Sequence, residues 1–285
     1  NDVYHGPTCY TNYYNGCILA EGLGIKKVYF LNYDYILNDG QYATTTKRDY
    51  LIILCKVLEY LKQPKLRDYI YNNNVKPLAE QHTKEEYKQV LDENEKINYI
   101  KYETLFNKVQ SLIDIYNNKP NIKNMLRLLI LSLYVLQPPL RNDYYNMKII
   151  YNDIQNDKKS NYLLLDKDNI YIIINNDKVI NLHGTAEIPI TNAILKTILN
   201  IYLDEYATNN IYLFQNKNGT PYKKHQIQYI INMMFEDKLL NIYNLRSSYI
   251  TNFYKNNLGL LERSILADSM RHGTRQAELS YFKNI

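Results

Sequence analysis

The sequence of 285 residues is 46% apolar and 22% charged and carries a formal net charge of +5. This length and apolar content allow one large or two ordinary globular domains and exclude a disordered chain. The longest apolar run, residues 128–136, is far shorter than the roughly 18 residues that a membrane span needs. No charged-then-apolar leader opens the sequence, so neither a membrane protein nor a secreted one is expected.

Cysteine is scarce and odd in number, at Cys9, Cys17 and Cys55. An odd count argues against a disulfide framework and favours a reducing, intracellular compartment. His5 with Cys9 and Cys17 lacks the paired CxxC or HxxxH spacing of a zinc site. We therefore expect neither a metal nor another cofactor.

The excess positive charge lies in the C-terminal part of the chain. Residues 121–285 carry 19 Lys and Arg against 14 Asp and Glu, whereas residues 1–120 carry 15 of each. Such a bias fits a polyanionic partner, although many enzymes without one are equally basic.

The N-terminal half divides into an unpatterned segment and a helical one. Residues 1–40, rich in Tyr, Asn and Gly, show no periodicity, and their role stays open. From residue 41 apolar positions recur at three- and four-residue steps behind Thr44 to Thr46, which can cap a helix. These positions are Leu51, Leu54, Val57, Leu58 and Leu61. We expect a helical bundle over residues 41–116 and a linker at 117–121, "NNKPN".

In the second half of the sequence, the spacing of the apolar residues changes twice. A buried helix is expected at 122–136, stopped by Pro138 and Pro139. The β-branched or alternating stretches at 148–154, 161–166, 169–176 and 186–190 then predict a small antiparallel sheet, and helices return from residue 191. The expected fold class is α+β, with a helical domain followed by a mostly helical domain that holds the sheet.

Four stretches carry residues of chemical interest, and each has an ordinary structural explanation by itself. Arg141 follows the double proline, where we expect the next helix to begin, and Lys178 stands beside the tip of a predicted hairpin. Arg246 lies near the start of a predicted helix. The stretch "MRHGTRQAELSYF" places His272 nine residues before Tyr281, but a chain with 31 tyrosines makes that spacing weak evidence.

Together these residues resemble the catalytic domain of the tyrosine recombinases, the integrase family. That family orders Arg, a hairpin Lys, His-x-x-Arg, His or Trp, and Tyr, and the matching residues here stand at intervals of 37, 68, 26 and 9. The stretches "PPLRNDYYNMKI" and "MRHGTRQAELSYF" look most like integrases of large eukaryotic DNA viruses, virophages and related mobile elements. The resemblance covers about residues 122–285, with a weaker likeness from residue 41, and implies a tyrosine recombinase fold with a core-binding-like domain at 41–116.

The resemblance implies an enzyme that cleaves and rejoins double-stranded DNA through a 3′-phosphotyrosine, without ATP or another cofactor. It would serve integration, excision or resolution of a viral or mobile element. The expected assembly is a homotetramer on synapsed DNA, in the host nucleus or a viral replication compartment, with no membrane involved.

The implied roles agree with the chemistry of phosphodiester cleavage. Arg141 and Arg246 would hold the non-bridging oxygens bidentately. His272 would stabilise the charge that develops on them, Tyr281 would be the nucleophile, and Lys178 would protonate the departing 5′ oxygen.

Other positions depart from the family's order or allow two interpretations. The histidine expected three residues before Arg246 is Tyr243, and a phenol is a poor base near neutral pH. Arg271 and Arg275 could support the phosphate or lie on a solvated helix face. DNA-backbone contacts, or plain surface, are expected at Lys223, Lys224 and His225.

Two alternatives stay open. A type IB topoisomerase shares this chemistry but relaxes supercoils as a monomer. A catalytically inactive, DNA-binding relative is the other alternative, and the tyrosine at position 243 is its only support.

Overall fold

The computed structural model describes most of the chain from residue 37 onward, and the chain divides into two compact units between residues 88 and 89. The described residues are 37, 38, 40, 42–87, 89–91, 93–152, 159–167, 169–235, 238–256 and 259–284. His5, Cys9 and Cys17, and nearly all of the unpatterned segment 1–40, lie outside them.

The first unit is helical, as predicted. It consists of α3 (Thr44–Tyr60), α4 (Pro64–Ile70), the π-helical turn η1 (Tyr71–Val75) and α5 (Lys76–Tyr87). Leu51, Leu54 and Leu58 of α3 are buried in its core, as their spacing predicted. The predicted threonine cap is wrong, because Ala43 is the N-cap residue, without a side-chain bond, and Thr44 already lies inside α3.

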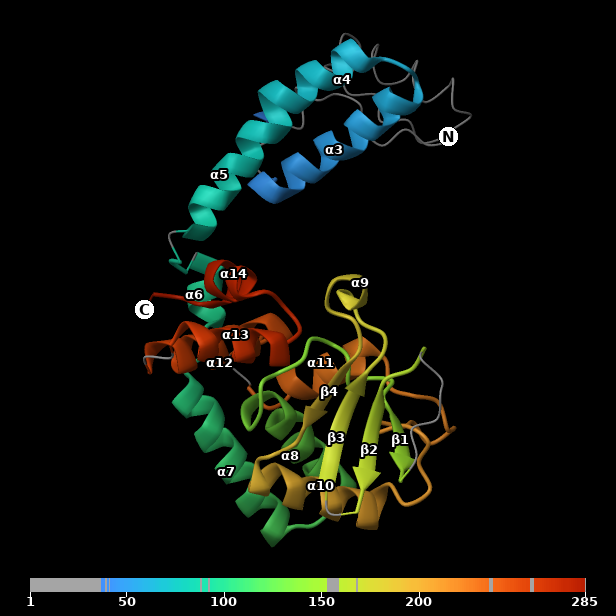
Figure 1. Ribbon diagram of the computed structural model, residues 1–285. Helices are drawn as coiled ribbons and strands as arrows, with labels where there is room; N and C mark the ends of the chain where they lie inside the picture. Colours follow the sequence, from blue (N-terminus) through green and yellow to red (C-terminus); the bar gives the residue numbers. More distant parts are fainter. Residues whose placement is uncertain are drawn as a thin grey trace, which may run out of the picture. The chain divides into compact units, whose positions relative to one another are not determined.

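The second unit holds the apolar helix α8 (Ile122–Val135) and further helices. The further helices are α6 (Glu93–Asn98), α7 (Tyr102–Asn118), α10 (Ala193–Tyr206), α11 (Lys224–Asn232), α12 (Ile242–Lys255), α13 (Leu260–Ser269), α14 (Thr274–Gln276) and the π-helical turn η2 (Ala277–Tyr281). Residues 128–135 of α8 are all buried, because α7, α10, α11 and α12 pack against it. This confirms the buried helix predicted from the sequence (Figure 1).

A four-stranded sheet completes the second unit. Its strands lie in the order β1 (Lys148–Tyr151), β2 (Tyr162–Asp166), β3 (Asn169–Ile174) and β4 (Ala186–Pro189). The four strands confirm the predicted stretches, but the sheet is mixed rather than antiparallel, because β1 and β2 run parallel. The short helix α9 (Ile180–His183) lies in the β3–β4 connection.

The boundary between the units differs from the linker expected at 117–121. Leu105, Val109 and Leu112 of α7 are buried in the same core as α8, so α7 belongs to the second unit. Residues 117 and 118 end α7, and residues 119–121 form a short connection to α8. In this connection the Asn121 side chain accepts a hydrogen bond from the backbone N of Asn124 at 3.0 Å and caps α8.

The segment after the double proline also differs from expectation. A turn at 141–146, not a helix, leads from Arg141 into β1. Among the described residues, no helix is both long and apolar enough to cross a bilayer.

Candidate active site

Four of the residues singled out in the sequence meet in the second unit. Arg141 lies on the turn after α8, Arg246 is buried on α12, His272 stands between α13 and α14, and Tyr281 ends η2. The Tyr281 ring joins them: its centroid lies 4.8 Å from Cζ of Arg246 and 5.3 Å from the centroid of the His272 ring. Residues 140 positions apart thus form one cluster.

Arg246 is the centre of this cluster and is only 1% exposed. One of its terminal nitrogens donates to the carbonyl of Pro139, just before Arg141, and the other donates to the carbonyl of Met270 at 3.1 Å. Burial lowers the pKa of Arg246, attraction to Tyr281 opposes this, and Arg141 adds to the lowering. An arginine stays protonated even so, and its Nε has no partner among the described residues.

His272 is a buried, neutral imidazole. Burial, followed by the charges of Arg246 and Arg141, lowers its pKa to about 3. Its Nδ1 lies 3.4 Å from the Gly273 carbonyl, and its buried Nε2 has no partner among the described residues. If Nδ1 carries the proton, Nε2 presents a lone pair. A bound phosphate would offset the two arginine charges and raise the pKa of His272.

Tyr281 is held from both sides of its backbone. The Ser247 hydroxyl donates to the carbonyl of Tyr281 at 2.6 Å, and the Tyr243 hydroxyl donates to the carbonyl of Ser280. The rings of Tyr243 and Tyr281 lie 5.2 Å apart. Tyr243, which stands where the family resemblance implies a histidine, therefore lies against the candidate nucleophile, and its hydroxyl helps to hold the backbone of Ser280.

Arg271 is neither on a solvated helix face nor available to a phosphate. Its side chain is buried and makes two bonds to the carboxyl of Asp177, at 2.9 and 3.2 Å, and others to the carbonyls of His183 and Gly184. Its own carbonyl accepts a bond from Arg141 at 2.7 Å. Arg271 therefore fastens the turn before His272 to the β3–β4 connection and orients Arg141.

Lys178 follows Asp177 directly in that connection, as the hairpin prediction placed it. The Asp177–Arg271 pair thus brings the backbone of Lys178 to the edge of the cluster. Its side chain is exposed.

Two carboxyl groups that the sequence analysis did not single out belong to the cluster. Burial raises the pKa of Asp143, as does repulsion by Asp177, whereas Arg141 and Arg246 lower it. With both carboxyls ionised, three guanidiniums still outnumber them, so the cluster keeps a positive charge for an anion. The position of Asp143, two residues after Arg141, was the only signal in the sequence.

The other predicted DNA contacts are at exposed positions. Lys223, Lys224 and His225 are exposed at the start of α11, where Lys224 Nζ lies 5.4 Å from the Tyr145 ring centroid. Arg275 is exposed on α14. Their contact with DNA stays a prediction.

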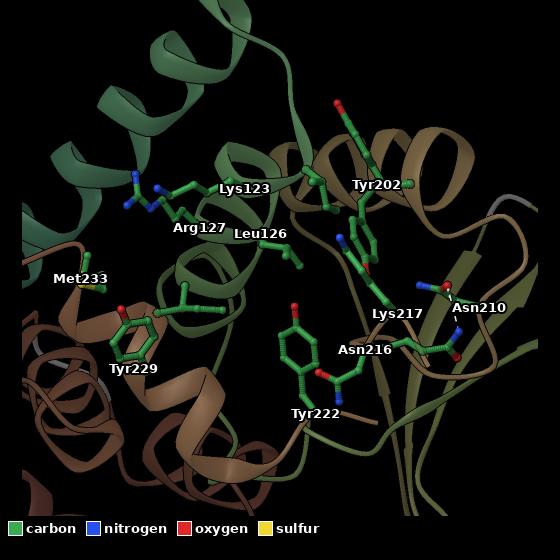
Figure 2. A pocket seen from close by; sticks show the side chains of 14 residues that line it. Lys123, Leu126, Arg127, Tyr202, Asn210, Asn216, Lys217, Tyr222, Tyr229 and Met233 are labelled. Atoms are coloured by element: carbon green, nitrogen blue, oxygen red, sulfur yellow. Dashed lines mark hydrogen bonds between the residues drawn. The ribbon is translucent and has the colours of Figure 1, made fainter. Parts of the chain in front are cut away.

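A separate pocket of about 600 Å³ opens between α8, α10 and α11 and shares no lining residue with the cluster (Figure 2). Lys123, Arg127 and Lys217 line it together with Tyr222 and Tyr229, and no carboxylate does. The described residues hold no group of three or more His, Cys, Asp or Glu that could bind a metal ion.

No protein-family model matches the sequence, and no curated protein matches it. Among solved structures, the chain is similar to one described as the crystal structure of XerA recombinase, with a TM-score of 0.44 and 15% identity over 96% of this chain and 94% of that one. At this TM-score the likeness assigns no residue, so the function proposed below stands on the geometry of the cluster and on the sequence motifs.

Proposed function

We propose that this chain cleaves and rejoins double-stranded DNA, with Tyr281 as the nucleophile. The observation that supports this most directly is the position of Tyr281 beside buried Arg246, with neutral His272 on its ring and Arg141 fixed nearby. A phosphate placed there would meet two guanidiniums. His272 Nε2, which has no partner among the described residues, can accept the phenolic proton and then donate it to a phosphate oxygen.

The reaction conserves the phosphodiester energy. The Tyr281 oxygen attacks the phosphorus, the bond to the 5′ oxygen breaks, and a 3′-phosphotyrosine forms. The phenolic proton passes to His272 Nε2, which the incoming phosphate has made more basic, and Lys178 gives a proton to the 5′ oxygen. Attack by a 5′-hydroxyl reverses each step, so no ATP is needed.

A nicked duplex that traps the covalent intermediate tests this proposal. The parent protein should become linked to DNA at Tyr281, and Tyr281→Phe should lose the linkage while still binding duplex. Tyr254→Phe is the matched control, because the buried Tyr254 hydroxyl has no partner among the described residues. A linkage mapped to any other tyrosine would refute the assignment.

The finer function rests on the resemblance in "PPLRNDYYNMKI" and "MRHGTRQAELSYF". It includes integration, excision or resolution for a viral or mobile element, a homotetramer on synapsed DNA, and action in the nucleus or a viral replication compartment. Recombination of two duplexes, as opposed to relaxation of a supercoiled one, separates this function from that of a type IB topoisomerase. Failure of the parent protein to form any covalent adduct would favour the inactive relative, whose support is Tyr243.

A further inference from the structure

The segment that carries Tyr281 is tied to the first residues of the second unit. The Gln89 side chain donates to the carbonyl of Glu278 at 3.1 Å, and the backbone N of Asn284 donates to the carbonyl of Gln89 at 2.9 Å. Residues on both sides of Tyr281 are therefore bonded to the residue with which the second unit begins.

A largely buried ion pair strengthens this connection. Lys283 Nζ lies 3.0 and 3.1 Å from the two carboxylate oxygens of Glu95 on α6, and the two side chains are 9% and 24% exposed. The backbone N of Lys283 also donates to the Thr251 hydroxyl at 3.0 Å. Lys283 is thus fixed at its backbone and at the end of its side chain, two residues after Tyr281.

The same carboxylate reaches the other side of Tyr281 through Tyr243. The Tyr243 hydroxyl shares its single proton between a Glu95 carboxylate oxygen at 3.3 Å and the carbonyl of Ser280. Lys283 Nζ lies 6.0 Å from the centroid of the Tyr243 ring. Glu95, Tyr243 and Lys283 therefore form one latch around the backbone of Tyr281, and Glu95 contacts both of its other members.

We propose that Glu95 and Lys283 are positioning residues, which hold Tyr281 against the arginines and couple its placement to residues 89–95, at the start of the second unit. This inference rests on the proposed function. Glu95 and Lys283 belong neither to the candidate phosphate site nor to the predicted DNA contacts. Loss of either should therefore slow covalent attachment without weakening DNA binding, since small displacements of a reacting group cost up to about 100-fold in rate.

The test compares Glu95→Gln, Lys283→Gln and the double variant in the full-length chain. Single-turnover attachment at saturating nicked duplex gives the rate, and fluorescence anisotropy gives the Kd. We expect attachment to be 10- to 100-fold slower, about the range for a displaced reacting group, with Kd changed by less than about twofold. The double variant should be no slower than the worse single one, because the two residues act as a pair.

Two variants separate positioning from general destabilisation. Lys283→Arg keeps the charge and should recover most of the rate. Glu278→Gln removes a carboxylate from the same segment, where it pairs with Arg263 at 3.5 Å with both side chains about one-third exposed, and should stay near the parent rate.

The outcomes distinguish the two proposals. Parent-like rates for Glu95→Gln and Lys283→Gln, or defects that multiply in the double variant, would overturn the latch while leaving Tyr281 as the nucleophile. Equal losses in the Glu278→Gln control would overturn it too. If the parent protein forms no adduct at Tyr281, the proposed function itself fails.

Discussion

Replacing His272 should remove a large part of the protein's sensitivity to acid. The pKa of His272 is lowered to about 3 in the folded chain, first by burial and then by Arg246 and Arg141, whereas an unfolded histidine titrates near 6.5. Between these values the unfolded chain binds more protons than the folded chain, so the free energy of unfolding falls as pH falls. The stabilising contribution of neutral His272 is fully present above about pH 6.5. From pH 7.5 to 4.5 this single group costs about 2.5 kcal/mol.

The variant His272→Phe keeps a ring against Tyr281 but cannot titrate. Urea unfolding of the parent and the variant, followed by circular dichroism at several pH values from 7.5 to 4.5, should give free-energy curves that converge toward low pH by about 2.5 kcal/mol. The control is His225→Phe, which removes a histidine at an exposed position. Parallel curves for the parent and His272→Phe would show that the folded histidine titrates normally and that the neutral-imidazole argument is incorrect.

Three further results are expected. Lys178→Ala should cleave ordinary DNA very slowly but recover on DNA with sulfur at the bridging 5′ position, because a thiolate leaves without a proton, whereas Arg141→Ala should not recover. Single-turnover cleavage of both substrates by both variants tests this, and equal defects of Lys178→Ala on the two substrates would contradict the general-acid role. Asp177→Ala should lower the free energy of unfolding by about 3–5 kcal/mol, because it leaves the charge of buried Arg271 unpaired, and a loss below about 1 kcal/mol in urea titrations would argue against that pair. Duplex binding should weaken with salt, and Lys224→Ala should reduce the slope of log K against log salt by about 0.9; an unchanged slope would remove this residue from the DNA interface.

The sequence predicted the elements whose signal is local. The helix 122–136 and the four strands were predicted because apolar runs mark these elements and turn residues mark their ends. The unit boundary was misplaced because "NNKPN" has the composition of a linker and of a tight helix-capping turn alike. Only burial of α7 in the same core as α8 tells the two apart.

The sequence predicted those site residues whose types and order resemble the catalytic residues of a known family. Arg141, Arg246, His272 and Tyr281 were singled out in this way, and the structure brings them together. The Asp177–Arg271 pair joins residues 94 positions apart, and the Glu95–Lys283 pair joins residues 188 apart. No local pattern encodes such pairs, since each side chain alone looks like an ordinary surface charge.

The π-helical turn η2 gives the interval between His272 and Tyr281 a geometric meaning. The backbone N of Phe282 bonds to the carbonyl of Ala277, five residues back, where an α-helix would bond four back. The π-turn thus contains one residue more than a regular α-helix between the same end points, and each residue of an α-helix turns the chain by about 100°. Deleting that extra residue while keeping Tyr281 in place would leave a regular helix. A related protein whose tyrosine follows its histidine at an interval of eight residues could therefore place the two rings as this chain does, whereas one with an interval of nine and no π-turn would point its tyrosine elsewhere.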